Sequence, residues 1–206
     1  AWGGKWCRTA AGHEAYAKEN EANGTRQSAR EAYLLASMAY HFACNNSPQN
    51  LDEYIPAAKK RVECYAKAAP YLDPPAERQE VPFEDFRMAA YFRLPPGIKR
   101  PPVVVIISGL ESTKEEARTM EDGLLHRGMA TFTFDGPGQG ETWFQGGMIV
   151  DFERATSAVI DYLEKLSQVD ANRLGVFGPS MGGYLAPRSA ACDPRTKACT
   201  FAGGMY

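Results

Sequence analysis

Histidine is scarce in this chain of 206 residues: it has only His13, His41 and His126, and none follows position 126. Long apolar runs are missing too, since the longest, residues 103–108, is far shorter than the roughly 20 residues that a membrane-spanning helix needs. The formal net charge is −2, so there is no basic excess to attract nucleic acid or an anionic membrane. We therefore expect neither as a partner.

The cysteines show no pattern of pairing. There are five, an odd number, and no two have the spacing of zinc ligands. The N-terminus lacks the pattern of a signal peptide. We interpret the cysteines as small buried side chains in a reducing compartment, which predicts a cytoplasmic protein. No metal or other cofactor is implied.

Residues 1–75 form an alanine-rich section with helical periodicity. The pattern predicts one helix over residues 2–20, a second after Thr25 as its N-cap, and a third after a break at residues 45–50. The third helix begins either behind Asn50 as its cap or at Pro56 as its first residue. Prolines at residues 70–75 then indicate a linker.

Residues 76–206 alternate between strand and helix patterns. Strands are predicted over residues 78–83, 87–94, 103–108, 129–134, 173–177 and 198–201. Helices are predicted over residues 112–126, 152–166 and 181–191, the first with Ser112 and Glu115 as a capping box. This alternation predicts the α/β class, with a mostly parallel sheet covered by helices on both faces.

The stretch GVFGPSMGGY contains G-x-S-x-G, made by Gly178, Ser180 and Gly182. It follows a predicted strand and precedes a predicted helix, which is the setting of a nucleophile elbow. Such a sharp turn leaves no room for side chains two residues before or after the serine. The serine would also sit at a helix N-terminus, where the Met181 N–H could hold an oxyanion. The alternative is a tight turn with a capping serine and no chemistry.

The loops after two other predicted strands complete the candidate site. After residues 103–108, Gly109 permits a close turn, and the Leu110 N–H is the candidate for the second oxyanion donor; a simple strand-to-helix connection is the alternative. Glu111 would lie at the mouth of the site, either in contact with substrate or solvated. Asp135 opens DGPGQGE at the carboxyl end of its strand, where such sheets bind ligands. We interpret that loop as a turn that shapes the pocket wall.

The segments GLESTKEE, FDGPGQGE and GPSMGGY, in this order behind a helical section, resemble an α/β-hydrolase family. This family contains 2,6-dihydroxypseudooxynicotine hydrolase, and fungal polyketide-shortening hydrolases and fermentation-respiration-switch-like esterases look like relatives. The resemblance implies a serine hydrolase that cleaves an ester or a carbon–carbon bond next to a ketone in a small carbonyl substrate. It implies Ser180 as nucleophile and Leu110 and Met181 at the oxyanion positions.

The resemblance also implies an acid and a histidine later in the chain than the serine. After Ser180 the sequence offers only Asp193 and no histidine. We therefore expect the chain to be the front of a longer enzyme, with the N-terminal half of its sheet, and to be inactive alone. The open sheet edge could support a homodimer.

Two other functions fit parts of the pattern. A prolyl-oligopeptidase-like peptidase would also carry G-x-S-x-G-G-Y, but it would need many short strands upstream, where this sequence is helical. A non-catalytic α/β module that binds a small molecule or a partner would have the same fold without the chemistry.

Overall fold

The chain divides between Ala76 and Glu77 into two units, Ala1–Ala76 and Glu77–Tyr206. A computed structural model describes residues 2–46 and 48–203. Each unit has a hydrophobic core of its own. In the described part of the chain, no helix combines the length and the apolar character needed to cross a membrane.

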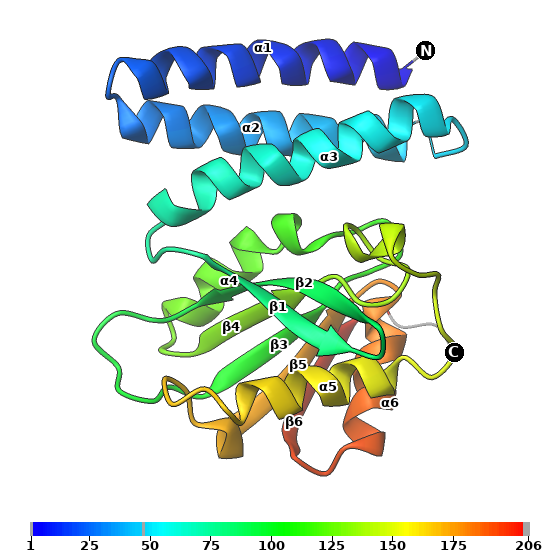
Figure 1. Cartoon of the computed structure of the whole chain (residues 1–206). Coiled ribbons are helices and arrows are strands. Elements are labelled where there is room, and N and C mark those ends of the chain that lie inside the picture. The colour runs from blue at the N-terminus through cyan, green and yellow to red at the C-terminus, as the bar shows by residue number, and fades with distance from the viewer. Residues whose placement is uncertain (1, 47, 204–206) are drawn as a thin grey trace. The chain divides into compact units, whose positions relative to one another are not determined.

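The first unit consists of three helices, α1 (Trp2–Ala22), α2 (Arg26–Asn45) and α3 (Leu51–Ala68), and α2 packs against both others (Figure 1). Small side chains fill most of the core, which lets the helix backbones approach closely. Asn50 is the N-cap residue of α3, so the alternative start at Pro56 is wrong. Pro56 instead lies inside this helix.

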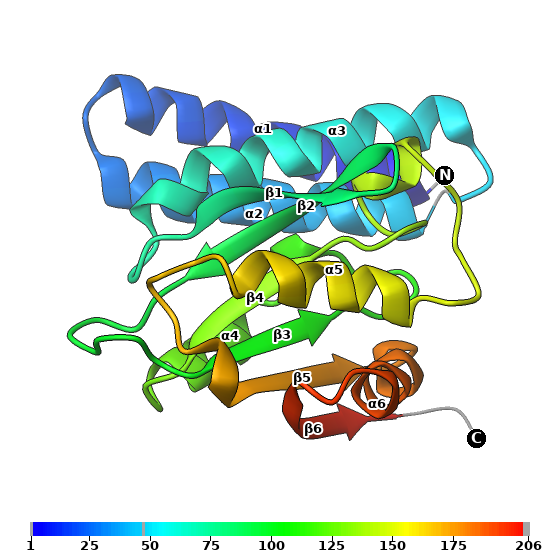
Figure 2. The same ribbon diagram turned by 60° about the horizontal axis from the view of Figure 1, so that its bottom comes forward.

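The second unit is a six-stranded sheet in the order β1-β2-β4-β3-β5-β6. The strands are β1 (Glu77–Phe83), β2 (Phe86–Arg93), β3 (Val103–Ile107), β4 (Ala130–Phe134), β5 (Leu174–Pro179) and β6 (Thr196–Ala202). The helices are α4 (Arg118–Leu125), α5 (Glu153–Leu163) and α6 (Gly182–Cys192). β3 to β6 run parallel, and the β1–β2 hairpin is antiparallel and joins β4 through β2 (Figure 2). The predicted α/β class with a mostly parallel sheet is confirmed.

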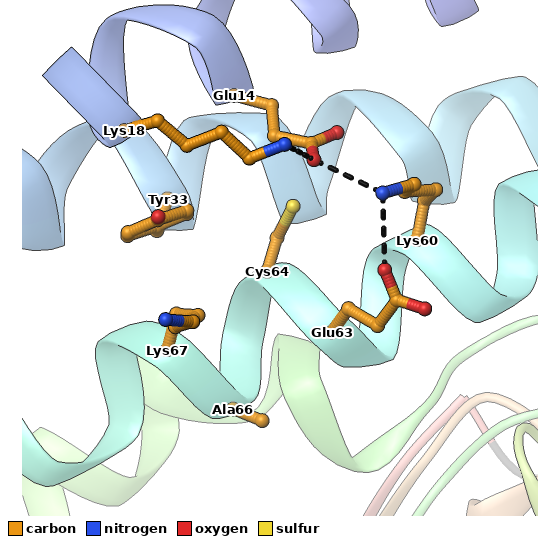
Figure 3. A pocket seen from close by; sticks show the side chains of 8 residues that line it. All are labelled: Glu14, Lys18, Tyr33, Lys60, Glu63, Cys64, Ala66 and Lys67. Carbon is orange, nitrogen blue, oxygen red and sulfur yellow. Dashed lines mark hydrogen bonds and ion pairs between the residues drawn. The ribbon is translucent and has the colours of Figure 1, made fainter.

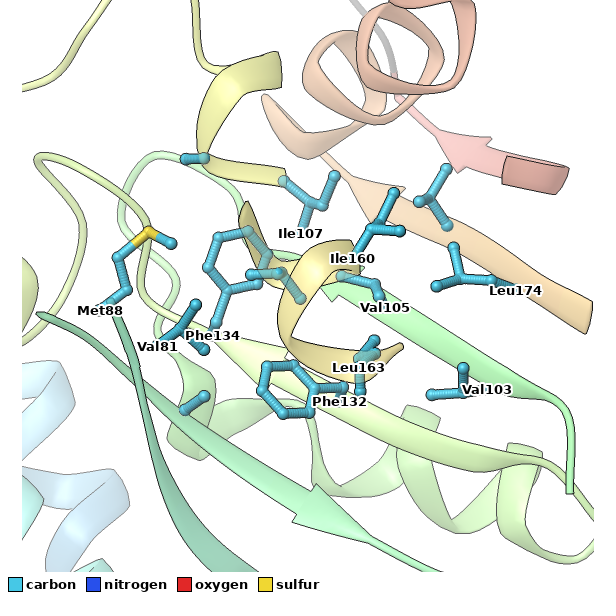
Figure 4. Packing of buried hydrophobic residues seen from close by; sticks show 14 of the residues in the cluster. Val81, Met88, Val103, Val105, Ile107, Phe132, Phe134, Ile160, Leu163 and Leu174 are labelled. Atoms are coloured by element: carbon cyan, nitrogen blue, oxygen red, sulfur yellow. The ribbon is translucent and has the colours of Figure 1, made fainter. Parts of the chain in front are cut away.

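Helices cover both faces of this sheet. On one face α5 presses Ile160 and Leu163 onto the strands, against Val105 and Phe132 among others (Figure 4). α6 adds Leu185 and Ala186 to the same cluster. α4 lies on the opposite face (Figure 2). The parallel strands are buried on both sides, which explains their continuous apolar sequences.

The helix predicted over residues 112–126 is different in the structure. A short 3₁₀ turn, Lys114–Glu116, comes first, and α4 begins at Arg118. The predicted capping box of Ser112 and Glu115 is wrong by one residue: Thr113 is the cap, and its N–H donates to Glu116 Oε1 at 2.8 Å. The physical reason is burial, because the Lys114 and Glu115 side chains turn inward.

Candidate active site

Ser180 occupies the turn between β5 and α6. Its φ is 55°, in the left-handed region that residues other than glycine rarely adopt. The Ser180 N–H donates to the carbonyl oxygen of Ala202 in β6 at 2.8 Å, and the residue is exposed. Backbone strain of this kind persists only where the surrounding structure enforces it, and it is concentrated at functional sites.

Two glycines make the turn possible. A Cβ on Gly178 would lie 1.9 Å from the carbonyl oxygen of Gly182. A Cβ on Gly182 would lie 2.1 Å from the carbonyl oxygen of Ile107, at the end of β3. Backbone oxygens cannot move aside as a flexible side chain can, so both positions require glycine. This is the packing that a nucleophile elbow needs.

The loop after β3 passes directly beside the serine. A Cβ on Gly109 would lie 3.1 Å from Ser180 Cβ and 3.4 Å from its Oγ. Leu110 follows with a half-exposed side chain. Within residues 2–46 and 48–203, neither the Leu110 N–H nor the Met181 N–H donates a hydrogen bond. Both amides therefore stay available, and their oxyanion role stays a prediction.

The two carboxylates predicted near substrate lie in different surroundings. Glu111 is exposed on the loop after β3. Asp135, in contrast, is completely buried: Oδ1 accepts from the Lys114 N–H at 2.9 Å, and Oδ2 accepts from the Glu141 N–H at 2.9 Å. Asp135 therefore ties two loops together inside the protein and does not face solvent.

Lys114 is a fully buried cation that sequence reasoning missed. Its Nζ lies 2.6, 2.8 and 3.0 Å from carboxylate oxygens of Glu115, Asp135 and Glu141. Burial alone would lower the pKa of Lys114, but these three carboxylates raise it above its usual value. The lysine stays charged and holds the loop after β3 to the loop after β4.

In the part of the chain that the structure describes, no histidine or carboxylate is hydrogen-bonded to Ser180. Its Oγ makes no hydrogen bond within the described residues. His126 is the C-cap residue of α4 and comes just before β4 begins, so it lies at the amino ends of the parallel strands, whereas Ser180 lies at their carboxyl ends. Asp193 follows the last turn of α6, away from the serine, and a hydrogen bond from Arg195 lowers its pKa to about 2.

The helical unit contains a pocket of about 560 Å³ (Figure 3). It is lined by Glu14, Lys18, Tyr33, Lys60, Glu63, Cys64, Ala66 and Lys67. Glu14 Oε1 lies 2.6 Å from Lys18 Nζ and 3.0 Å from Lys60 Nζ, so its charge is balanced locally. In residues 2–46 and 48–203, no group of three or more acidic, cysteine or histidine side chains is arranged to hold a metal ion. We assign no chemistry to this pocket.

The sequence is similar to those of curated hydrolases. The chain is 44% identical over 207 residues to 2,6-dihydropseudooxynicotine hydrolase of Paenarthrobacter nicotinovorans, covering 99% of this chain and 55% of that protein. It is 35% identical over 222 residues to 20-hydroxy-prefusarin hydrolase of Gibberella moniliformis, covering 99% and 52%. The chain thus spans about half the length of these curated relatives.

Solved structures give the same result. The crystal structure of 2,6-dihydroxy-pseudo-oxynicotine hydrolase matches with a TM-score of 0.89 and 42% identity, over 97% of this chain and 56% of that one. AbyA5 shares the fold, with a TM-score of 0.75 at 23% identity over 99% of this chain and 55% of its own. The family model described as "Esterase FrsA-like" matches residues 1–205. The chain therefore belongs to the FrsA-like esterase family, with the α/β-hydrolase fold.

Proposed function

We propose that this chain carries the nucleophile of a serine hydrolase that cleaves an ester or a carbon–carbon bond next to a ketone. The observation that carries the proposal is the position of Ser180, exposed at φ 55° with Gly109 against its side chain. A turn that tolerates this strain and excludes side chains on both sides presents one hydroxyl at a helix N-terminus.

The proposed reaction begins when Ser180 Oγ attacks the carbonyl carbon. The hydroxyl proton passes to a histidine, which we propose lies outside residues 1–206, since no histidine follows the serine here. The N–H groups of Leu110 and Met181 would hold the oxyanion, and one such donor is worth about 3–4 kcal/mol in comparable sites. Collapse expels an alcohol, or a carbon leaving group as an enolate, which takes up the proton that the histidine accepted; water then hydrolyses the acyl enzyme to a carboxylic acid and restores the serine hydroxyl.

Apolar side chains at the carboxyl ends of the parallel strands favour an aromatic or other apolar substrate. They are Leu110, Trp143, Phe144 and Tyr184, each at least one third exposed. Leu110 follows β3, the Trp143–Phe144 pair follows β4, and Tyr184 lies in the first turn of α6. The relatives named above are a 2,6-dihydropseudooxynicotine hydrolase and a 20-hydroxy-prefusarin hydrolase.

A turnover panel on the full gene product tests this function. We expect cleavage of an aryl ester or an aryl β-diketone, and a loss of at least about 10³-fold in Ser180→Ala. Ser167→Ala is the matched control, because Ser167 is exposed outside the site. The 206-residue chain alone should show little turnover. Cleavage confined to dipeptide amides would favour the peptidase, and a full gene product without any turnover would favour the binding module.

We also propose that the protein works in a reducing compartment such as the cytoplasm. Burial raises the pKa of Cys44 to about 11 and that of Cys64 to about 12. Thiols with such values stay protonated and react slowly at neutral pH. Cys44 and Cys64 act as small apolar side chains in the helical core. Cys192 and Cys199 are exposed, so the expectation that the cysteines are buried is wrong for these two.

A further inference from the structure

Gln139 is a fully buried carboxamide between the loops that follow β3 and β4. Its Nε2 donates to the carbonyl oxygens of Ser108 at 3.0 Å and Gly109 at 3.1 Å. Its Oε1 accepts from the Gly136 N–H at 3.1 Å. The reversed amide would set Oε1 against two carbonyl oxygens, so this network admits only one orientation.

The bond to Gly109 has a consequence for the next residue. The Gly109 carbonyl and the Leu110 N–H belong to one planar trans peptide unit, so they point in opposite directions. By holding the carbonyl, Gln139 fixes the direction of the Leu110 N–H. That N–H makes no hydrogen bond within residues 2–46 and 48–203, and its neighbour Gly109 lies against Ser180.

The loop that carries Gln139 is itself fixed by close packing. Gly138 and Gly140 have φ of 76° and 43°. A Cβ on Gly140 would lie 2.2 Å from Asp135 Oδ2, so this position also requires glycine. Asp135 in turn binds the Lys114 N–H at 2.9 Å. The two loops are therefore joined twice, through Asp135 and through Gln139.

We propose that Gln139 is a positioning residue, whose carboxamide holds the Gly109–Leu110 peptide so that the Leu110 N–H faces the oxyanion formed at Ser180. This inference rests on the proposed function. An oxyanion donor contributes most when its direction is fixed before the reaction. The hydrogen bond from such a donor strengthens only as negative charge develops on the substrate oxygen. Misaligning the donor therefore lowers kcat and leaves substrate binding nearly unchanged.

The test compares Gln139→Met and Gln139→Glu with a matched control, Gln145→Met, in the full gene product. Gln145 also donates to a backbone carbonyl, that of Arg87 at 3.1 Å, but it lies on the exposed hairpin side of the same segment. Enzyme concentration is set by titration with a fluorophosphonate, so only folded, reactive enzyme is counted. The measurements are kcat and KM for an aryl ester and the inhibition constant of a trifluoromethyl ketone.

We expect both Gln139 variants to lower kcat by about 10- to 100-fold and to weaken the ketone inhibitor similarly, with KM changed less than about twofold. Gln145→Met should match the wild type. If the Gln139 variants are labelled at Ser180 but keep the kcat and the inhibitor affinity of the wild type, the positioning role of Gln139 is overturned and the proposed function still stands. A rise in KM with kcat intact would overturn it too. If the wild type is not labelled at Ser180, the proposed function fails and this inference fails with it.

Discussion

Gly182 lies directly against the carbonyl oxygen of Ile107, so that a Cβ on the glycine would approach this oxygen to 2.1 Å. The contact joins the first residue of α6 to the last residue of β3. These two elements carry the serine turn and the loop with the candidate oxyanion donor. The close approach therefore fixes the spacing between the two halves of the proposed site.

We predict that Gly182→Ala lowers the free energy of unfolding by about 1–3 kcal/mol, because overpacking must shift backbone against backbone. Urea denaturation of the full gene product measures this. Gly147→Ala is the control, since its Cβ would meet nothing within 4 Å, and its effect should stay within about 0.5 kcal/mol. Equal stability of the two variants would show that the turn relaxes freely.

Lys114→Met should be strongly destabilising, by about 3–5 kcal/mol. The substitution preserves most of the side-chain volume but takes the Lys114 ammonium away from the completely buried carboxylate of Asp135. Lys165→Met, at an exposed position, serves as the matched control. If both methionine variants unfold at the same urea concentration, the buried ion cluster contributes no net stability.

Glu121 should make the protein less stable as pH rises. Burial raises its pKa to about 7, although Arg93 and Thr131 favour the charged form. Between the unfolded value of 4.5 and about 7, the folded state keeps the proton that the unfolded state has released. In this window, stability falls with increasing pH, and above it the loss is complete.

The measurement is the free energy of unfolding of wild type and Glu121→Gln at pH 5 and pH 8. The wild type should lose roughly 2–3 kcal/mol more than the glutamine variant over this interval. The variant keeps the shape and the contact with Thr131 but loses the contact of Oε2 with Arg93. Because the glutamine does not titrate, this loss shifts the variant equally at both pH values, and the difference between the two pH profiles isolates the titration. Parallel pH profiles would mean that Glu121 titrates at an ordinary carboxyl value.

Local signals predicted most of the second unit. Apolar patterns marked the strands to within two residues, and Gly178 and Gly182 around Ser180 predicted a sharp turn. The exclusion at Gly178 is local, since its Cβ would meet the carbonyl oxygen of Gly182, whereas that at Gly182 comes from Ile107 at the end of β3. The capping box was misplaced because Lys114 turns inward to Asp135, which lies 21 residues away. That contact depends on two loops meeting in space, and no local pattern encodes it.

The candidate site was predictable to the same degree. Ser180, Leu110 and Met181 follow from one turn and one strand end. Gln139 was visible only as part of a glycine-rich loop, because its role depends on carbonyls 30 and 31 residues earlier. The loop glycines signalled unusual backbone conformations, but a buried amide and a solvated one look the same in a sequence.

Labelling of Ser180 tests the central claim most directly. The full gene product is treated with a fluorophosphonate and digested, and the adduct is located by mass spectrometry. We predict one adduct, on the peptide that contains Ser180, which Ser180→Ala abolishes and Ser167→Ala leaves intact. A folded protein that takes up no label, or that is labelled equally in Ser180→Ala, would contradict Ser180 as the nucleophile.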